Sequence, residues 1–264
     1  MSQIIHVNTD QNDHNAFHSI HEALQSIPSD NTTPITIEIA PGTYREKLTI
    51  DKPYLTLLGS GAQNSDTILT YDDYANDTLS NGEKRGTFRS YSVLVDTHDI
   101  TLCNLTIENA SGDSKTHGQA IALYADGDRL LFDHCRLLGH QDTLFTGPLP
   151  PKEIKPGGFV GPKQFAPRIN GRHYYKDCYI CGDIDFIFGS ATAYFEHCTL
   201  ESLLRTKTSA QSDLVSTTST LHDSGCDTSA LCHSNSDMVQ KNYTLPPIQG
   251  YVTAASTPEG QEYG

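Results

Sequence analysis

Residues 177–200 read DCYICGDIDFIFGSATAYFEHCTL, and this stretch holds two copies of one short pattern. In Asp177-Cys178-Tyr179-Ile180 and in His197-Cys198-Thr199-Leu200, a cysteine is followed two positions later by an aliphatic residue. The pattern also occurs upstream, in Leu102-Cys103-Asn104-Leu105 and His134-Cys135-Arg136-Leu137, so successive cysteines lie 32, 43 and 20 residues apart. Irregular periods of about 20 residues or more are typical of a solenoid whose coils are joined by loops of variable length. We therefore expect small thiols to stack inside the coils.

The rest of the chain also reads as short strands. Ile35, Ile37 and Ile39 alternate with polar residues, and further strands are expected at 47–50, 54–58, 92–95 and 101–107. A β-sandwich would show hairpin turns at intervals of roughly 8–12 residues, and no Asn-Gly or Asp-Gly hairpin with two alternating flanks dominates this sequence. The expected architecture is all-β, a single-stranded right-handed parallel β-helix.

One helix is expected near the N-terminus. Phe17, Ile20, Leu24 and Ile27 recur at spacings of 3, 4 and 3 residues, which places them on one helical face. Asn12 or Asp13 is expected to cap its start, and Pro28 to end it. Its apolar face predicts a helix that covers one end of the solenoid core.

Two segments interrupt the pattern of a single domain over residues 1–264. Gly147–Gly171 is rich in proline and glycine and reads as a long ordered loop, of the kind that often carries function. Residues 206–249 are rich in Ser, Thr, Asp and Asn and read as a flexible insertion.

Composition narrows the partners and the compartment. The formal net charge of −14 disfavours nucleic acid and anionic membranes as partners. The N-terminus Met1–His6 lacks a basic segment followed by an apolar stretch, so we expect a cytoplasmic protein with reduced thiols. Cys178-x-x-Cys181 has no second cysteine pair at zinc-site spacing, which disfavours a metal site. We further expect a monomer without a cofactor.

The run Gly182–Gly189 reads as a strand, which would point Asp183 and Asp185 to the same side. Asp142 follows Gln119 by 23 residues, and Asp185 follows Asp142 by 43, of which the 25-residue loop Gly147–Gly171 takes up more than half. Gln119, the pair Gln141-Asp142, and Asp185 are therefore expected on three successive coils, about 4.8 Å apart.

Two carboxylates at that spacing do not both ionise readily, so one stays protonated as a general acid beside an ionised nucleophile or base. The glutamine amides would supply uncharged donors to an oxyanion. The sequence holds no Gly-x-Ser-x-Gly elbow and no His-Glu-x-x-His motif, which disfavours serine-hydrolase and zinc-protease chemistry.

Four motifs, taken together, resemble those of the pectin methylesterases (pectinesterases). They are Gly42-Thr43-Tyr44-Arg45-Glu46, Gln119-Ala120, Gln141-Asp142-Thr143-Leu144 and Asp185-Phe186-Ile187-Phe188-Gly189. The resemblance runs from about Ile4 to the last residue, apart from the Ser/Thr-rich segment. It implies a right-handed parallel β-helix that hydrolyses galacturonate methyl esters of pectin or oligogalacturonides without a metal and releases methanol.

The resemblance also implies roles for individual residues. Asp185 matches the nucleophile, and Asp142 the general acid that later acts as base. Gln141 and Gln119 match the amides at the oxyanion. Phe145 and Phe188 would contact the sugar ring, although ordinary packing is an equally good interpretation of both aromatic residues.

One family motif, Gly-Arg-Pro-Trp, is absent, and its arginine pairs with the nucleophilic carboxylate. We therefore expect the chain to correspond to the N-terminal portion of such an enzyme. Two alternatives stay open. One is an inactive carbohydrate-binding remnant, and the other is a β-helix lyase or glycosidase, which would need a calcium-binding acidic cluster or carboxyl groups roughly 6.5–9.5 Å apart.

Overall fold

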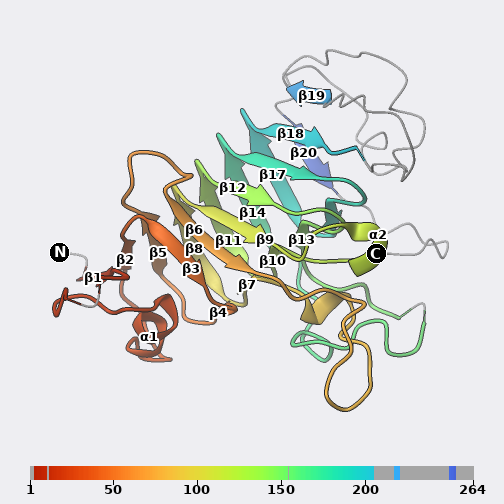
Figure 1. Cartoon of the computed structure of the whole chain (residues 1–264), viewed down its shortest axis with the longest axis horizontal. Helices are drawn as coiled ribbons and strands as arrows, with labels where there is room; N and C mark the ends of the chain where they lie inside the picture. Colours follow the sequence, from red (N-terminus) through yellow and green to blue (C-terminus); the bar gives the residue numbers. More distant parts are fainter. Residues whose placement is uncertain (1–2, 11, 154, 205–216, 221–249, 254–264) are drawn as a thin grey trace.

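The computed structural model describes residues 3–10, 12–153, 155–204, 217–220 and 250–253. Its strands form three sheets that extend side by side along the molecule (Figure 1). The eight-stranded sheet contains β1 (Gln3–Val7), β2 (Ile35–Ile39), β5 (Leu55–Gly59), β8 (His98–Cys103), β11 (Asp128–Asp133), β14 (Arg172–Lys176), β17 (Thr192–Glu196) and β20 (Gly250–Thr253). The seven-stranded sheet contains β3 (Gly42–Arg45), β6 (Thr67–Tyr71), β9 (Thr106–Asn109), β12 (Arg136–Leu138), β15 (Tyr179–Gly182), β18 (Thr199–Ser202) and β19 (Thr217–Thr220). The five-stranded sheet contains β4 (Leu48–Ile50), β7 (Val93–Val95), β10 (Leu123–Ala125), β13 (Leu144–Thr146) and β16 (Ile187–Gly189).

From β2 to β16 the chain visits the eight-, the seven- and the five-stranded sheet in turn, one strand in each per coil. Neighbouring coils pair in parallel, and among the described strands only the pairs β17–β20 and β18–β19 are antiparallel. This confirms the predicted right-handed parallel β-helix.

The corner between the eight- and the seven-stranded sheet repeats more regularly than the cysteines do. Asn104, His134, Asp177 and His197 each occupy it with a left-handed φ between 52° and 53°. A single left-handed residue turns the chain sharply, which splits the predicted strand 101–107 into β8 and β9.

The position of this corner shows that the predicted alignment of the four cysteines is wrong for Cys103. Cys103 precedes its corner and lies opposite Asp133, whereas Cys135, Cys178 and Cys198 follow theirs and are buried. Leu105 takes the equivalent place in the earlier coil. Among the described residues the stack of thiols therefore has three members, because the corner residue sets the register and a cysteine two positions earlier lies in a different row.

The core fills the space between the three sheets. Phe132, Tyr175 and Phe195 stack through it on successive coils, with ring centroids 4.6 Å apart and rings within 9° of parallel. Each of the three stacked thiols donates to a carbonyl of the preceding coil, as Cys178 Sγ does to Phe132 O at 3.3 Å. Helix α1 (Ile20–Gln25) adds Ile20, Ala23 and Leu24 to this core at its N-terminal end (Figure 1), as predicted.

The cap of α1 differs from the prediction. Ser19 is the N-cap and accepts from Glu22 N at 3.1 Å, whereas Asn12 and Asp13 lie in an earlier turn. The Glu46 carboxylate accepts from Ile20 N and His21 N, at 3.0 and 2.8 Å, and so satisfies two more amides of the first turn. Asp13 is engaged locally, because its carboxylate accepts from Asn15 N.

The remaining elements are α2 (Ser114–His117) and a 3₁₀ turn, η1 (Thr87–Arg89). The segment Gly147–Gly171 contains neither helix nor strand in its described residues, as expected of a loop. Apart from β19, the Ser/Thr-rich segment 206–249 lies outside the described residues. None of the described helices has the length and apolarity needed to cross a membrane.

Candidate functional site

The predicted site residues gather at one edge of the five-stranded sheet. Strands β10, β13 and β16 are neighbours in register, with Leu123 opposite Leu144 and Leu144 opposite Ile187. Gln119 lies four residues before β10, Gln141 and Asp142 lie three and two residues before β13, and Asp185 lies two residues before β16. The predicted placement on three successive coils is thus the one observed.

Backbone hydrogen bonds continue the ladder into these pre-strand segments. Ala120 N donates to Gln141 O, and Asp142 N donates to Ile184 O, both at 3.0 Å. Asp142 and Asp185 therefore lie at equivalent positions of adjacent coils. Both have left-handed backbone, with φ of 69° and 43°. Non-glycine residues in this conformation carry a cost that proteins commonly retain at functional sites.

The run Gly182–Gly189 is not the single strand that its sequence predicts. Strand β15 ends at Gly182, β16 begins at Ile187, and the four residues between them form a bend. The chain passes here from the seven- to the five-stranded sheet, so strand alternation does not apply. Asp183 is only 5% exposed, whereas Asp185 is exposed. The prediction that the two side chains point to the same side is therefore wrong.

Asp142 is fully buried, and neither of its carboxylate oxygens has a hydrogen-bond partner among the described residues. Burial, and then the negative charges of Asp185 and Asp183, hold the pKa of Asp142 well above its usual range. A carboxyl group in this setting keeps its proton, which is the state of a general acid.

Asp185 has a different environment. Its side chain is exposed at the surface, while the protein on its inner side displaces part of its hydration and raises its pKa. No lysine or arginine forms an ion pair with it in the described part of the chain. Two carboxyl groups on adjacent coils, one buried and one open to water, form the kind of pair that divides into an acid and a nucleophile.

Gln119 and Gln141 are both half-buried. Their backbone carbonyls accept hydrogen bonds from neighbouring segments. Gln119 O accepts from Ala75 N at 2.8 Å, and Gln141 O accepts from Ala120 N. Their side-chain amides form no hydrogen bond with any described residue, so the donors needed by an oxyanion remain available.

Phe145 and Phe188 lie on the outer side of the same sheet, inside an aromatic cluster with Phe88, Tyr124 and Phe159. The rings of Phe145 and Phe188 lie 4.8 Å apart, and their residues are 2% and 8% exposed. Both rings are packed among aromatic neighbours, and both line a small apolar hollow together with Phe88, Pro148, Pro150, Phe159, Gly189 and Ser190. Sequence reasoning missed Phe88 and Phe159 because they lie in segments without strand periodicity.

The loop Gly147–Gly171 is fastened over this cluster by several contacts. Lys163 forms an ion pair with Asp96, at the end of β7, and its Nζ is 3.9 Å from Asp126, at the end of β10. Ser190 Oγ donates to Pro148 O at 2.9 Å, and Arg168 donates to four loop carbonyls. The loop forms a fixed wall beside the sheet.

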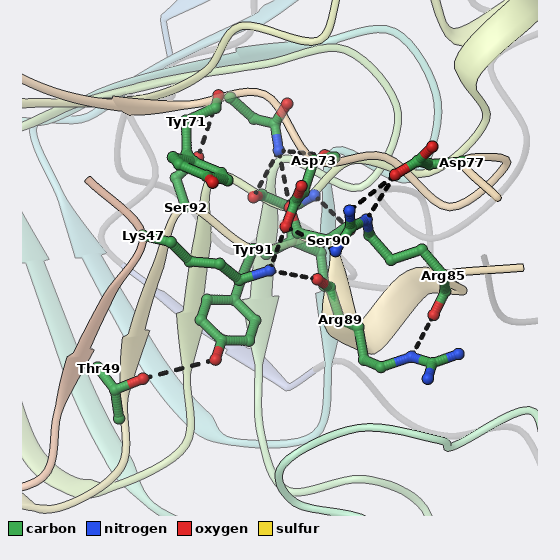
Figure 2. A network of polar contacts seen from close by, with 12 residues as sticks. Lys47, Thr49, Tyr71, Asp73, Asp77, Arg85, Arg89, Ser90, Tyr91 and Ser92 are labelled. Atoms are coloured by element: carbon green, nitrogen blue, oxygen red, sulfur yellow. Dashed lines mark hydrogen bonds and ion pairs between the residues drawn. The ribbon is translucent and has the colours of Figure 1, made fainter. Parts of the chain in front are cut away.

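A second polar network lies further along the same sheet edge, just before β4 and β7 (Figure 2). Lys47 forms an ion pair with Asp73, donates to Arg89 O at 2.5 Å, and lies 4.5 Å from the ring centre of Tyr91. Arg85 joins Asp73 to Asp77, with distances of 2.9 and 2.7 Å. The network anchors the segment between β6 and β7, and sequence analysis gave no sign of it.

A possible metal site does not coincide with this edge. Among the described residues, only Asp133, His134 and Asp177 bring three ligand atoms within 4.8 Å of one another. They lie at the corner between the other two sheets, where His134 Nδ1 is 2.7 Å from Asp133 and His134 Nε2 is 3.8 Å from Asp177. We assign them no catalytic role.

Comparisons with known proteins indicate the family to which the chain is similar. A family model described as Pectinesterase matches residues 5–148 and 168–249, leaving out most of the loop Gly147–Gly171. Pectinesterase QRT1 of Arabidopsis thaliana is 32% identical over 188 residues, which are 70% of this chain and 44% of that protein. Pectinesterase 31 of the same plant is 34% identical over 184 residues, 68% of this chain and 50% of the relative.

Solved structures of pectin methylesterases are also similar to this chain. Pectin methylesterase PemA from Erwinia chrysanthemi superposes with a TM-score of 0.63 at 30% identity, over 78% of this chain and 58% of that one. A pectin methylesterase in complex with a hexasaccharide gives the same TM-score and identity, over 79% and 58% of the two chains. The chain spans about half the length of the curated relatives it matches.

Proposed function

Because the chain belongs to the pectinesterase family, we propose that it hydrolyses methyl esters of galacturonate units and releases methanol. The observation that carries this proposal is the pair of Asp142, buried without a hydrogen-bond partner among the described residues, and Asp185, exposed on the adjacent coil.

The first half of the proposed reaction forms an acyl-enzyme. An Asp185 carboxylate oxygen attacks the ester carbonyl carbon, and the amides of Gln141 and Gln119 donate to the resulting oxyanion. The tetrahedral intermediate then expels the methoxy group, which takes the proton of the Asp142 carboxyl and leaves as methanol. Asp185 is left joined to the substrate acyl group as an anhydride, and Asp142 is left ionised.

The second half restores the enzyme. The Asp142 carboxylate removes a proton from water, and the oxygen of that water attacks the acyl carbon. Collapse of this intermediate releases the free galacturonate carboxyl group and the Asp185 carboxylate. Asp142 ends protonated, so one water is consumed and one methanol is released in each cycle.

The proposed substrate is a methyl-esterified galacturonate chain, and the hexasaccharide in the complex of a structural neighbour is consistent with a sugar chain of that size. A net charge of −14 repels a chain of free carboxylates more than an ester-rich one. We therefore propose that short, highly methylated oligogalacturonides are preferred over long polymer that carries few methyl esters.

A second function, carbohydrate binding without catalysis, is favoured by one observation. No described cation pairs with Asp185, so nothing there keeps the nucleophile ionised against its raised pKa.

Methanol release from methylated oligogalacturonides tests both functions. We expect turnover by the wild-type chain, none by Asp185→Asn, and wild-type turnover by Asp177→Asn, which makes the same charge change at a distant corner. Sugar binding without methanol would support the binding function, and unsaturated or reducing-end products would indicate a lyase or a glycosidase.

A further inference from the structure

A third carboxylate, Asp183, lies beside the proposed catalytic pair and differs from both members in its contacts. Its backbone N donates to His140 O at 3.0 Å. Its side chain accepts from Ser114 Oγ at 2.6 Å, and His140 Nδ1 lies 3.8 Å from the same carboxylate oxygen. Asp183 and Ser114 are 5% and 3% exposed.

These contacts converge from three separate elements. Ser114 begins α2, His140 directly precedes Gln141-Asp142, and Asp183 directly precedes Ile184-Asp185. A hydrogen bond from a hydroxyl group and the positive charge of a nearby protonated imidazole each stabilise the charged form of a carboxylate. The effect is mutual, since Asp183, with a smaller contribution from Asp113, raises the pKa of His140.

The charged groups that act on Asp142 are Asp185 and Asp183, and no described lysine or arginine opposes them. Asp185 loses its charge when it becomes acylated, because the carboxylic anhydride that forms is neutral. Asp183 neither attacks the substrate nor transfers a proton in the proposed cycle, so the cycle leaves its carboxyl group and the effect of that group on Asp142 unchanged.

We propose that Asp183 is a positioning residue whose charge, held by Ser114 and His140, keeps the Asp142 carboxyl protonated at the pH at which it must donate. The consequence for turnover rests on the proposed function, but the effect on Asp142 does not require the chain to be an esterase.

Carbon-13 NMR of aspartate-labelled protein measures that effect without an activity assay. The Asp142 side-chain carboxyl signal is assigned by its loss in Asp142→Asn, and its titration is followed in the wild type and in Asp183→Asn. We expect the midpoint to fall by about one pH unit in Asp183→Asn, because a nearby buried charge is removed. Asp177→Asn, which removes a charge far from the site, should leave the midpoint unchanged.

Two further variants separate charge from structure. Asp183→Ser removes the charge and keeps a hydrogen-bonding side chain, so it should lower the midpoint as Asp183→Asn does. Asp183→Glu restores a carboxylate and should return the midpoint toward its wild-type value. An unchanged midpoint in either folded neutral variant overturns the proposal, and so does loss of the cooperative melt in both neutral variants, since Asp183 would then serve the fold alone.

Activity supplies an independent check. In the neutral variants the basic limb of the pH dependence of kcat should move to lower pH by the same amount, with KM changed less than twofold. Methanol release by none of the proteins, together with the expected NMR shift, would refute the proposed function and leave the role of Asp183 intact.

Discussion

Asp142 and Asp185 are residues of the same type and both have left-handed backbone, so their different proposed roles come from their surroundings alone. Asp142 is buried next to two negative charges, and Asp185 opens to solvent. A buried carboxyl group without a hydrogen-bond partner is costly, and proteins commonly keep such a group where it has a function.

That cost predicts a stability gain in Asp142→Asn. The folded-state pKa of Asp142 is raised, so the unfolded chain releases this proton first. The wild type therefore loses stability as pH rises above about 3.9, the pKa of an unperturbed aspartate, and continues to lose it up to the folded-state pKa. An asparagine does not titrate. We expect the melting temperature of Asp142→Asn to lie about 2–4 °C above that of the wild type at pH 7.5, which corresponds to about 1 kcal/mol. The difference in melting temperature should be smaller at pH 4.

Calorimetry at the two pH values checks this expectation. A gap that is the same at both, or a lower melting temperature for Asp142→Asn at pH 7.5, would contradict the burial of a proton-bearing carboxyl group at this position.

Gln141 gives a second prediction at the scale of one residue. Its amide is half-buried at the site and forms no hydrogen bond with the described residues, so its role is to be sought in the reaction. Gln141→Ala should lower kcat by roughly 10²–10³-fold if the amide is a principal oxyanion donor. Gln25→Ala, on the exposed face of α1, is the matched control and should keep the wild-type rate. An unchanged rate in Gln141→Ala would remove it from the oxyanion site.

Among the elements, the loop Gly147–Gly171 adds a wall beside the sheet, and the match to the family model leaves out residues 149–167 of this loop. Its attachment depends on Lys163, which reaches Asp96 and Asp126 at the ends of two neighbouring strands. Burial raises the pKa of Asp126 to about 6, against the opposing effect of Lys163.

The raised pKa of Asp126 predicts a pH-dependent stability. Between about pH 3.8 and pH 6 the folded protein holds a proton that the unfolded chain has released, so stability falls as pH rises through this range. Asp126→Asn lacks this titration. Its free energy of unfolding should rise relative to the wild type between pH 4 and pH 6.5, by at most about 3 kcal/mol.

Urea unfolding at pH 4 and pH 6.5 measures that difference. Asp30→Asn, at an exposed position near the end of α1, is the control and should track the wild type at both. Equal stability differences at the two pH values would show that Asp126 titrates normally in the folded protein.

The whole molecule carries a formal net charge of −14, and its proposed substrate gains one negative charge with each ester hydrolysed. Mutual repulsion should therefore slow turnover as demethylation proceeds. Raising the ionic strength from about 0.01 to 0.15 M shortens the screening distance from about 30 to 8 Å. We expect kcat/KM for half-methylated oligogalacturonides to rise several-fold over this range.

Fully methylated oligomers of the same length are the control for that experiment, because they carry almost no charge. Their kcat/KM should change little. An equal response of both substrates to salt would assign the effect to the protein rather than to repulsion between protein and substrate.

The sequence by itself determined the architecture and the order of the site. In a parallel β-helix, residues one coil apart in the chain become neighbours in the sheet, so spacing translates directly into proximity. The intervals between Gln119, Asp142 and Asp185, once the long loop is subtracted, placed them on three adjacent coils, and the alternation of isoleucines predicted β2.

Only the tertiary structure decided the environment of each residue. Burial of Asp142, exposure of Asp185 and the contact of Asp183 with Ser114 depend on other coils, and the last joins residues 69 positions apart. The same holds for the bend at Asp183–Phe186 and the displaced Cys103, because a corner between sheets overrides local periodicity. It also holds for the start of α1, where Glu46, 26 residues from Ile20, accepts from the amides of the first turn. Local pattern sets where the chain can turn and pair, whereas charge and hydration at a side chain depend on what the rest of the fold packs around it.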